Sequence, residues 1–229
     1  MDRPITVIGG AGRVASLIAQ KLLSGGERVR VVGRNERHAR KLPEGATFHA
    51  ADVRDPATLA EPLADCSAVV FSVEPGTADQ GADSPKSTMY QGVCNALNAA
   101  RAGGARPHFA LVSQIYVTRH DHPINNWGRM LDWRLAGEDA VRESGLPYTV
   151  VRPGWLTDKR SEGDQVHVEQ GDRGDGSVSR SDVAEAIVQS LYLPAADGLT
   201  FEIFNEQGSA RTDWNALFSS LRPGQVSAA

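Results

Sequence analysis

The sequence predicts an α/β protein with a doubly wound parallel sheet and helices on both of its faces. Apolar runs of strand length recur along the chain, and segments with apolar residues at helical spacing separate them. A glycine-rich turn joins the first run to the first helical segment. The expected strands are 5–8, 29–32, 47–50, 68–73, 108–112 and 148–152, and the clearest helical segments are 14–22, 93–100 and 131–141.

The C-terminal part of the chain has a different texture. Residues 157–179 are polar and glycine-rich, and only Val166 and Val168 alternate as a strand would, so we expect a loop or a small hairpin. Ser181 is expected to open a helix that reaches about residue 193. The tail 223–229 has little apolar surface to bury and is expected to fray. The remaining expected elements are a strand over 200–204 and a short helix over 212–221.

Composition excludes several functional classes. A net charge of -4, from 28 acidic and 24 basic side chains, offers no cationic surplus for nucleic acid. No apolar run approaches the roughly 20 residues of a membrane helix, and none follows a cationic start as in a secretory signal. Two cysteines are too few for a disulfide framework, and His120 and His122 on a loop are a weak metal-binding pattern. We therefore expect a cytosolic protein with one domain over 1–229 and no nucleic-acid, membrane or metal partner.

The first expected strand runs directly into the glycine-rich turn 9–12, and an amphipathic helix follows. This strand–turn–helix context is what a dinucleotide-binding fingerprint requires. Gly9 permits the tight turn, Gly12 lets the backbone approach a pyrophosphate, and the helix N-terminus offers unpaired amides. We therefore predict that Gly9, Gly12, Arg13 and Val14 bind a dinucleotide.

The end of the second expected strand favours NADP over NAD. Gly33 stands where NAD-preferring enzymes usually carry a carboxylate, and Arg34 can offer a charge-assisted fork to a 2′-phosphate. Arg13 and Arg37 are its expected helpers. The alternative is that Arg34 is a solvated cation at a helix start, and the nearby Glu36 keeps the choice of cofactor open.

The third and fourth expected strands also end in candidate cofactor residues. Asp52 can accept a hydrogen bond from the adenine amine, and Val53 can cover one face of the ring. The alternative is that Asp52 only caps the segment before Pro56. Ser72 lies at the end of the fourth strand and is expected to contact the cofactor as well.

The glycine-rich turn, 50–53, 136–154 and 178–184 together resemble the atypical short-chain dehydrogenase/reductases, which include NmrA-like and biliverdin reductase B-like proteins. The resemblance covers essentially the whole chain. It implies a Rossmann fold with NADP laid across the carboxyl ends of the strands, and Pro153 near the nicotinamide. It also implies a substrate pocket that the C-terminal region completes. The expected substrate-side elements are 74–87, 114–130 and 155–180.

One departure from this family pattern bears on catalysis. Conventional members use a tyrosine as proton donor and a lysine four residues later, and no tyrosine of this chain is followed by such a lysine. In the aligned segment Arg134 takes the lysine position and Met130 the tyrosine position. Arg134 can bind ribose or stabilise an oxyanion, but it does not titrate. The alternative is a simple ion pair between Arg134 and Glu138 on one helix.

Ser113 follows the fifth expected strand, where the family carries a serine or threonine that contacts substrate. Ser113 and Gln114 are therefore expected to face the nicotinamide, unless Ser113 is only a strand-end hydrogen bonder. Tyr116 lies just beyond and is the expected substitute proton donor, with a packed loop aromatic as the alternative. Trp127 and Trp155 either wall the substrate pocket or pack in the core.

These residues predict an NADPH-dependent reductase of a small carbonyl or quinone-like substrate, with Ser113, Tyr116 and Arg134 as its catalytic residues. The substrate class rests on the resemblance alone. One alternative is an NADP-binding redox sensor or regulator without turnover. Another is a redox-neutral isomerase or cyclase on the same fold. The sequence predicts no oligomeric state.

Overall fold

The structure is a computed structural model that describes residues 1–10, 12–76, 78–102, 104–209 and 211–226. Its main sheet consists of β1 (Ile5–Ile8), β2 (Val29–Gly33), β3 (Thr47–Ala50), β4 (Ala68–Phe71), β5 (His108–Val112), β6 (Tyr148–Pro153), β8 (Asp164–Glu169) and β10 (Leu199–Gln207). The strand order is β3-β2-β1-β4-β5-β6-β10-β8, and of these pairs only β10 with β8 is antiparallel. The order reverses between β1 and β4, as the predicted doubly wound Rossmann fold requires.

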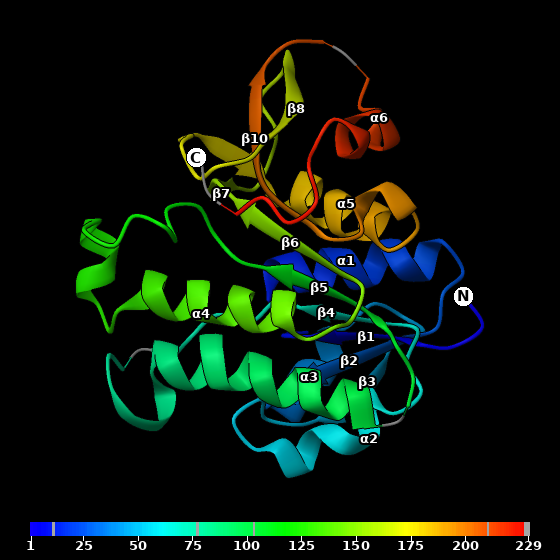
Figure 1. The fold of residues 1–229 in the computed structure, drawn as a ribbon. Coiled ribbons are helices and arrows are strands. Elements are labelled where there is room, and N and C mark those ends of the chain that lie inside the picture. The colour runs from blue at the N-terminus through cyan, green and yellow to red at the C-terminus, as the bar shows by residue number, and fades with distance from the viewer. Residues whose placement is uncertain (11, 77, 103, 210, 227–229) are drawn as a thin grey trace.

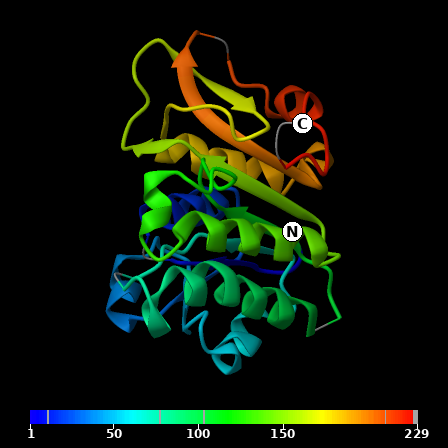
Figure 2. The same cartoon turned by 60° about the vertical axis from the view of Figure 1, so that its left-hand side comes forward.

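Helices cover both faces of the sheet (Figures 1 and 2). One face carries α1 (Arg13–Ser24) and α5 (Arg180–Ser190), and the other carries α3 (Gly92–Ala102) and α4 (Met130–Glu143). The short helices α2 (Ala60–Leu63) and α6 (Trp214–Ser219) lie at opposite ends of the molecule. A π-helical turn, Lys86–Gln91, leads into α3. The fold class predicted from the sequence is confirmed.

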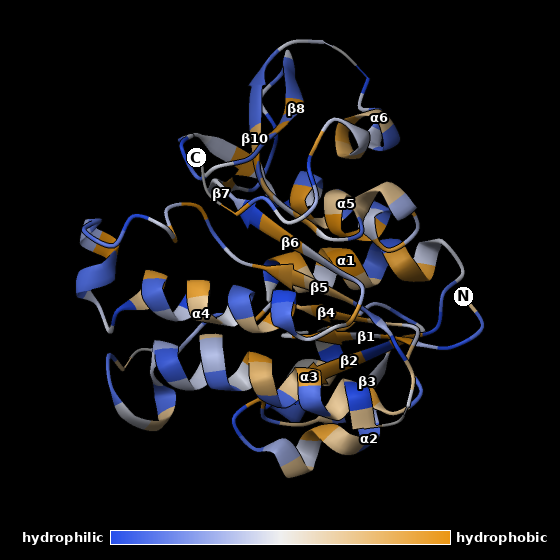
Figure 3. Ribbon diagram, in the orientation of Figure 1, coloured by the Kyte–Doolittle hydropathy of each residue, from blue (hydrophilic) through white to orange (hydrophobic). Residues whose placement is uncertain are grey.

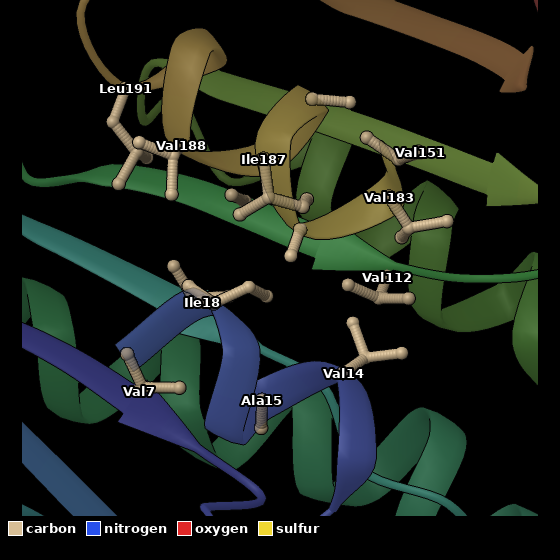
Figure 4. Packing of buried hydrophobic residues seen from close by; sticks show 14 of the residues in the cluster. Val7, Val14, Ala15, Ile18, Val112, Val151, Val183, Ile187, Val188 and Leu191 are labelled. Carbon is tan, nitrogen blue, oxygen red and sulfur yellow. The ribbon is translucent and has the colours of Figure 1, made fainter. Parts of the chain in front are cut away.

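Successive side chains of each strand point to opposite faces of the sheet, so the strands contribute to two cores, one on each face. In β1, Ile5 and Val7 join the core beneath α1 and α5, whereas Ile8 joins the core beneath α3. Figure 3 shows central strands coloured mainly as hydrophobic between helices on which hydrophobic and hydrophilic residues alternate. In Figure 4, side chains of α1 and α5 meet over β1, β5 and β6, with Ile18 and Ile187 both fully buried.

The segment 157–179 differs from the expected loop or hairpin. Its strand β8 pairs antiparallel with β10, far along the chain, rather than within the segment. The strands β7 (Trp155–Thr157) and β9 (Ser177–Ser179) pair parallel in a separate small sheet. The reason is that β10 continues past residue 204 to Gln207, which leaves an edge for β8 to pair with.

Two further expectations at the C-terminal end were wrong. The N-cap of α5 is Ser179 rather than Ser181, and its hydroxyl accepts the backbone N–H of Asp182 at 3.1 Å. The tail is docked as far as residue 226, because the Val226 carbonyl accepts a hydrogen bond from buried Arg152 at 2.8 Å. The expectation of fraying at 227–229 lies outside the described residues.

Candidate active site

A cavity of about 940 Å³ runs along the carboxyl ends of the strands at the point where the sheet order reverses. Residues from all three expected substrate-side elements line it, including Glu74, Gln114 and Trp155. The predicted site residues that line it are Gly9, Gly12, Arg13, Val14, Arg34, Asp52, Val53, Ser72, Ser113, Tyr116, Arg134 and Pro153.

Arg37 is the predicted site residue that the structure does not bring to the cavity. It lies in the 3-10 helix Glu36–Lys41 with an exposed side chain, and its backbone N–H donates to Asn35 Oδ1 at 2.9 Å. The geometry therefore gives no support to the expectation that Arg37 assists Arg34. Spacing from the strand end suggested the role, but the short helix carries the side chain elsewhere.

The glycine-rich turn forms one end of the cavity. Gly9 has a φ of +99°, and a Cβ at this position would lie 2.0 Å from the carbonyl oxygen of Ser72. Only glycine fits such a turn, because any side chain would meet the main chain that follows β4. Gly12 is the N-cap of α1 and provides no side-chain cap, so the helix N-terminus presents its amides to the cavity. Ala11 lies outside the described residues.

The ends of β2 and β3 carry a cluster of arginines and carboxylates. Asp52 accepts hydrogen bonds from Arg54 Nε at 2.9 Å and Nη2 at 2.6 Å. Hydrogen bonds from Arg54 lower the pKa of Asp52, even though burial raises it. Arg34 and Arg54 both reach Asp83, from the loop that follows β4. Arg54 and Asp83 are cavity residues that the sequence analysis missed, although Arg54 directly follows the predicted Asp52 and Val53.

The alternative role for Asp52, as a cap of the segment before Pro56, is present in the structure, because Asp52 Oδ1 accepts the backbone N–H of Arg54 at 3.0 Å. The 3-10 helix Pro56–Leu59 is capped by Asp55, whose side chain accepts the backbone N–H of Ala57 at 3.1 Å. Asp52 also lines the cavity, where its carboxylate binds the Arg54 guanidinium, and its contact with adenine stays a prediction.

Two buried donors at the β5 end of the cavity have no partner with ordinary hydrogen-bond geometry among the described residues. They are Ser113 Oγ, at the end of β5, and Arg134 Nε, on α4. The side chain of Arg134 is only 4% exposed, and its Nη2 donates to Glu74. Unpaired buried donors cost folding free energy, and they are expected where a ligand supplies the acceptor.

The alternative ion pair between Arg134 and Glu138 does not form. Glu138 is fully buried and pairs with Arg152, whose Nη2 lies 2.7 Å from Glu138 Oε2, and with Arg142 at 3.2 Å. Burial raises the pKa of Glu138, but the charge and hydrogen bonds of Arg152 outweigh this, with smaller contributions from Arg142 and the nearby Ser113 hydroxyl, and the net shift is downward. Because Arg152 on β6 and Arg142 on α4 bind Glu138, Arg134 does not pair with it and lines the cavity instead.

Tyr116 forms part of an aromatic wall. Its ring stacks on His122 at a centroid distance of 4.4 Å and meets Trp155 edge-on at 6.2 Å. Burial and a hydrogen bond to Asp175 raise the pKa of Tyr116, so the phenol stays protonated at neutral pH. Trp155 lines the cavity and is 55% exposed, whereas Trp127 is not a lining residue.

The two loop histidines serve different partners. His120 Nδ1 lies 2.7 Å from Asp132, and His122 stacks on Tyr116. Within the part of the chain that the structure describes, no three His, Cys, Asp or Glu side chains are grouped to hold a metal. No described helix is both long enough and apolar enough to cross a membrane. The expected cytosolic location stays a prediction.

The fold and the glycine turn at the cavity define a dinucleotide-binding protein of the Rossmann type. A family described as NAD(P)H-binding matches residues 9–194. The chain therefore belongs to this NAD(P)H-binding family of atypical short-chain dehydrogenase/reductases, as the resemblance implied. This membership makes it an NAD(P)-binding protein of an oxidoreductase family.

Similar proteins include reductases. The chain is 25% identical to sanguinarine reductase from Eschscholzia californica, over 96% of this chain and 97% of the relative. It is 27% identical to an NAD(P)H azoreductase from Xenophilus azovorans, over 94% of this chain and 73% of the relative. A solved structure from Bacillus halodurans, described as an NAD-dependent epimerase/dehydratase, superposes with a TM-score of 0.79 at 26% identity and covers 96% of this chain and 100% of its own.

Proposed function

We propose that this protein is an NADPH-dependent reductase that transfers hydride to a small carbonyl or quinone-like substrate. The observation that carries the proposal is a pair of buried donors on cavity-lining residues, Ser113 Oγ and Arg134 Nε, for which the described residues supply no acceptor with ordinary hydrogen-bond geometry. A substrate oxygen that gains negative charge during hydride transfer is the acceptor such donors suit best. The two named reductases among the relatives support the same reaction class.

The residues of the cavity fit a dinucleotide. The Gly9 turn and the uncapped N-terminus of α1 suit a pyrophosphate, because a close backbone and free amides are what phosphates bind. Arg34 and Arg54, at the ends of β2 and β3, suit a 2′-phosphate and support NADP over NAD. Pro153, at the end of β6, lines the cavity near Ser113 and is the proposed neighbour of the nicotinamide.

NADPH supplies the hydride when it is bound. In the proposed reaction, Ser113 and Arg134 donate hydrogen bonds to the substrate oxygen and stabilise the charge that develops as hydride adds to carbon. The oxygen then takes a proton, from Tyr116 or from water. Trp155, which is 55% exposed and packs edge-on against Tyr116, offers an aromatic face against which a flat substrate can lie. Glu74 holds Arg134 in place by binding Nη2.

A second candidate function is an NADP-binding sensor without turnover. It is favoured by the replacement of the conventional tyrosine and lysine with Met130 and Arg134, since an arginine does not serve as a titrating acid or base. The sensor and the reductase share the cofactor site and differ only in whether NADPH is consumed.

The test combines binding with turnover. NADPH and NADH binding is measured by fluorescence, and NADPH oxidation is followed by absorbance with a panel of quinones and aromatic ketones. A reductase oxidises NADPH with at least one of these, and Arg134→Leu lowers kcat about 100-fold, as loss of an oxyanion donor does. Arg101→Leu, an exposed arginine at the C-terminal end of α3 that does not line the cavity, is the matched control. Tight binding without oxidation favours the sensor, and substrate conversion without oxidation favours an isomerase or cyclase.

A further inference from the structure

One carboxylate oxygen is shared by two arginines at the end of the cavity where β2 and β3 finish. Asp83 Oδ1 lies 2.8 Å from Arg54 Nη1 and 3.4 Å from Arg34 Nη1. Arg54 Nη1 also donates to the carbonyl of Ala82 at 2.9 Å. Asp83 ends the short 3-10 helix Gly81–Asp83, which belongs to the loop after β4. The Asp83 carboxylate therefore connects the loop after β4 to the guanidinium groups of Arg34 and Arg54.

The backbone of the same loop makes room for this carboxylate. A Cβ added to Gly76 would lie 1.7 Å from Asp83 Oδ2, so the carboxylate packs directly against the main chain of residue 76. Any side chain at position 76 must push the Asp83 carboxylate away. Gly76, Asp83, Arg34 and Arg54 all line the cavity.

We propose that Asp83 occupies the anion position that the 2′-phosphate of NADP takes, and that the phosphate displaces it and releases the turn Gly81–Asp83. The inference rests on the NADP preference of the proposed function and is independent of turnover. Carboxylates and phosphates are the two anions that match a guanidinium fork, so Asp83 is the protein's own substitute for the phosphate. NADH has no such phosphate and leaves Asp83 in place.

The charge balance of the cluster explains why the Asp83 carboxylate and a 2′-phosphate cannot both bind Arg34 and Arg54. Arg34 and Arg54 are formally balanced by Asp52 and Asp83, so the cluster as folded has no charge left for a dianion. When Asp83 leaves, Arg54 remains anchored to Asp52 through Nε and Nη2, and its Nη1 becomes free. Arg34 is 57% exposed and can follow the phosphate. Asp83 therefore weakens NADPH binding by competition, and position 83 becomes a determinant of cofactor preference.

The binding test uses 2′,5′-ADP and 5′-AMP, which differ only in the 2′-phosphate. We expect Asp83→Asn to tighten 2′,5′-ADP about threefold to tenfold and to change 5′-AMP less than about twofold, the scale of partly exposed ion pairs. Gly76→Ala pushes the Asp83 carboxylate away from the arginines by steric contact, so we expect it to tighten 2′,5′-ADP binding as Asp83→Asn does. Arg54→Gln is expected to weaken 2′,5′-ADP alone. Asp79→Asn, an exposed carboxylate of the same loop, is the matched control.

Hydrogen exchange tests the release of the turn directly. Amides of residues 79–84 are expected to exchange faster with 2′,5′-ADP bound than with 5′-AMP bound, and the difference is expected to vanish in Asp83→Asn. Unchanged or weaker 2′,5′-ADP binding by Asp83→Asn, or slower exchange with 2′,5′-ADP, overturns the displacement while leaving NADPH-dependent reduction intact. If 2′,5′-ADP and 5′-AMP bind equally in every variant, both the displacement and the NADP preference fail. Reduction with NADH then stays open.

Discussion

Asp172 holds the turn that carries Tyr116, because its Oδ1 accepts the backbone N–H of Tyr116 at 2.5 Å. Its Oδ2 accepts both the backbone N–H and the hydroxyl of Thr118 at 2.8 Å, so both carboxylate oxygens bind one turn. Tyr116 has a φ of +74°, a left-handed conformation that costs a non-glycine residue free energy. Asp172 is in turn held by buried Glu202, which accepts its N–H at 3.1 Å. The position of Tyr116 is therefore imposed from outside its own segment.

Asp172→Asn tests this support. An asparagine side chain has only one acceptor oxygen, so it cannot accept hydrogen bonds from both Tyr116 and Thr118 as the two carboxylate oxygens do. We therefore expect a loss of about 1–3 kcal/mol in unfolding free energy. In the folded variant KM should rise more than kcat falls, because the aromatic wall moves while Ser113 and Arg134 stay. Urea unfolding and steady-state kinetics measure the two effects. Asp121→Asn, on an exposed loop, is the control, and a variant as stable and as active as the parent contradicts the assignment.

Tyr116→Phe separates proton donation from packing. The ring contacts with His122 and Trp155 survive this change, so stability should stay within about 1 kcal/mol of the parent. If Tyr116 supplies the proton, kcat should fall about 100-fold, the lower range for loss of a general acid. A solvent isotope effect on kcat reports whether proton transfer has become limiting. Unchanged turnover assigns the proton to water.

Ser113→Ala is expected to affect activity more than stability. Ser113 Oγ is buried and has no partner with ordinary hydrogen-bond geometry among the described residues, although it lies close enough to Glu138 to help lower the pKa of that carboxyl, so its removal should change the unfolding free energy by less than about 1 kcal/mol. If the hydroxyl binds the substrate oxygen, kcat should fall about 10- to 100-fold. Ser190→Ala is the control, because that buried hydroxyl donates to the Ile187 carbonyl and its loss should destabilise without affecting kcat in the folded protein.

The fold could be predicted because its signals are local. Strand-length apolar runs and the Gly9 turn depend on neighbours in sequence, and parallel order follows from alternation of strands with helices. The carboxyl ends of such strands meet at one edge, which is why Asp52, Ser72 and Ser113 were found together at the cavity. The pairing of β8 with β10 was missed because local sequence patterns do not indicate which distant strand a given strand pairs with.

The parts of the site that were missed depend on distances across the fold. Arg54 and Asp83 are far apart in sequence, and only the structure shows that they share a contact. The same holds for Arg134, whose spacing suggested Glu138 although the fold supplies Glu74 instead. Helical spacing shows which side chains are neighbours on one element, but not which competing partners another element brings.

Glu138→Gln should be among the most destabilising single changes in the molecule. Glu138 and Arg152 are both fully buried, and removing one charge leaves Arg152 with Glu202 as its remaining carboxylate partner. Breaking a buried pair in this way costs about 3–5 kcal/mol. The matched control is Asp139→Asn, an exposed partner of Arg142 on the same helix, which should cost under about 1 kcal/mol. Equal losses for the two variants contradict the buried-pair assignment.

His108 gives the folded protein a predictable dependence on pH. Burial lowers the pKa of His108 from its usual 6.5 to about 4, and the charge of Asp197 opposes that shift only in part. Its Nε2 lies 2.9 Å from Thr149 Oγ1, and that hydroxyl already donates to the Ala196 carbonyl. The imidazole must therefore donate from Nε2, and it folds as the neutral form with a proton on that nitrogen.

The sign of the effect follows from this lowered pKa. Between pH 6.5 and about 4 the unfolded chain binds a proton that folded His108 excludes, so this contribution to stability is present above pH 6.5 and lost as the pH falls toward 4. His108→Gln keeps a donor at the Nε2 position and removes the titration. The parent should therefore lose about 3 kcal/mol of unfolding free energy relative to His108→Gln between pH 7 and pH 4. Urea unfolding at both pH values measures it. Parallel pH profiles for the two proteins show instead that His108 is protonated as readily in the folded state as in the unfolded chain.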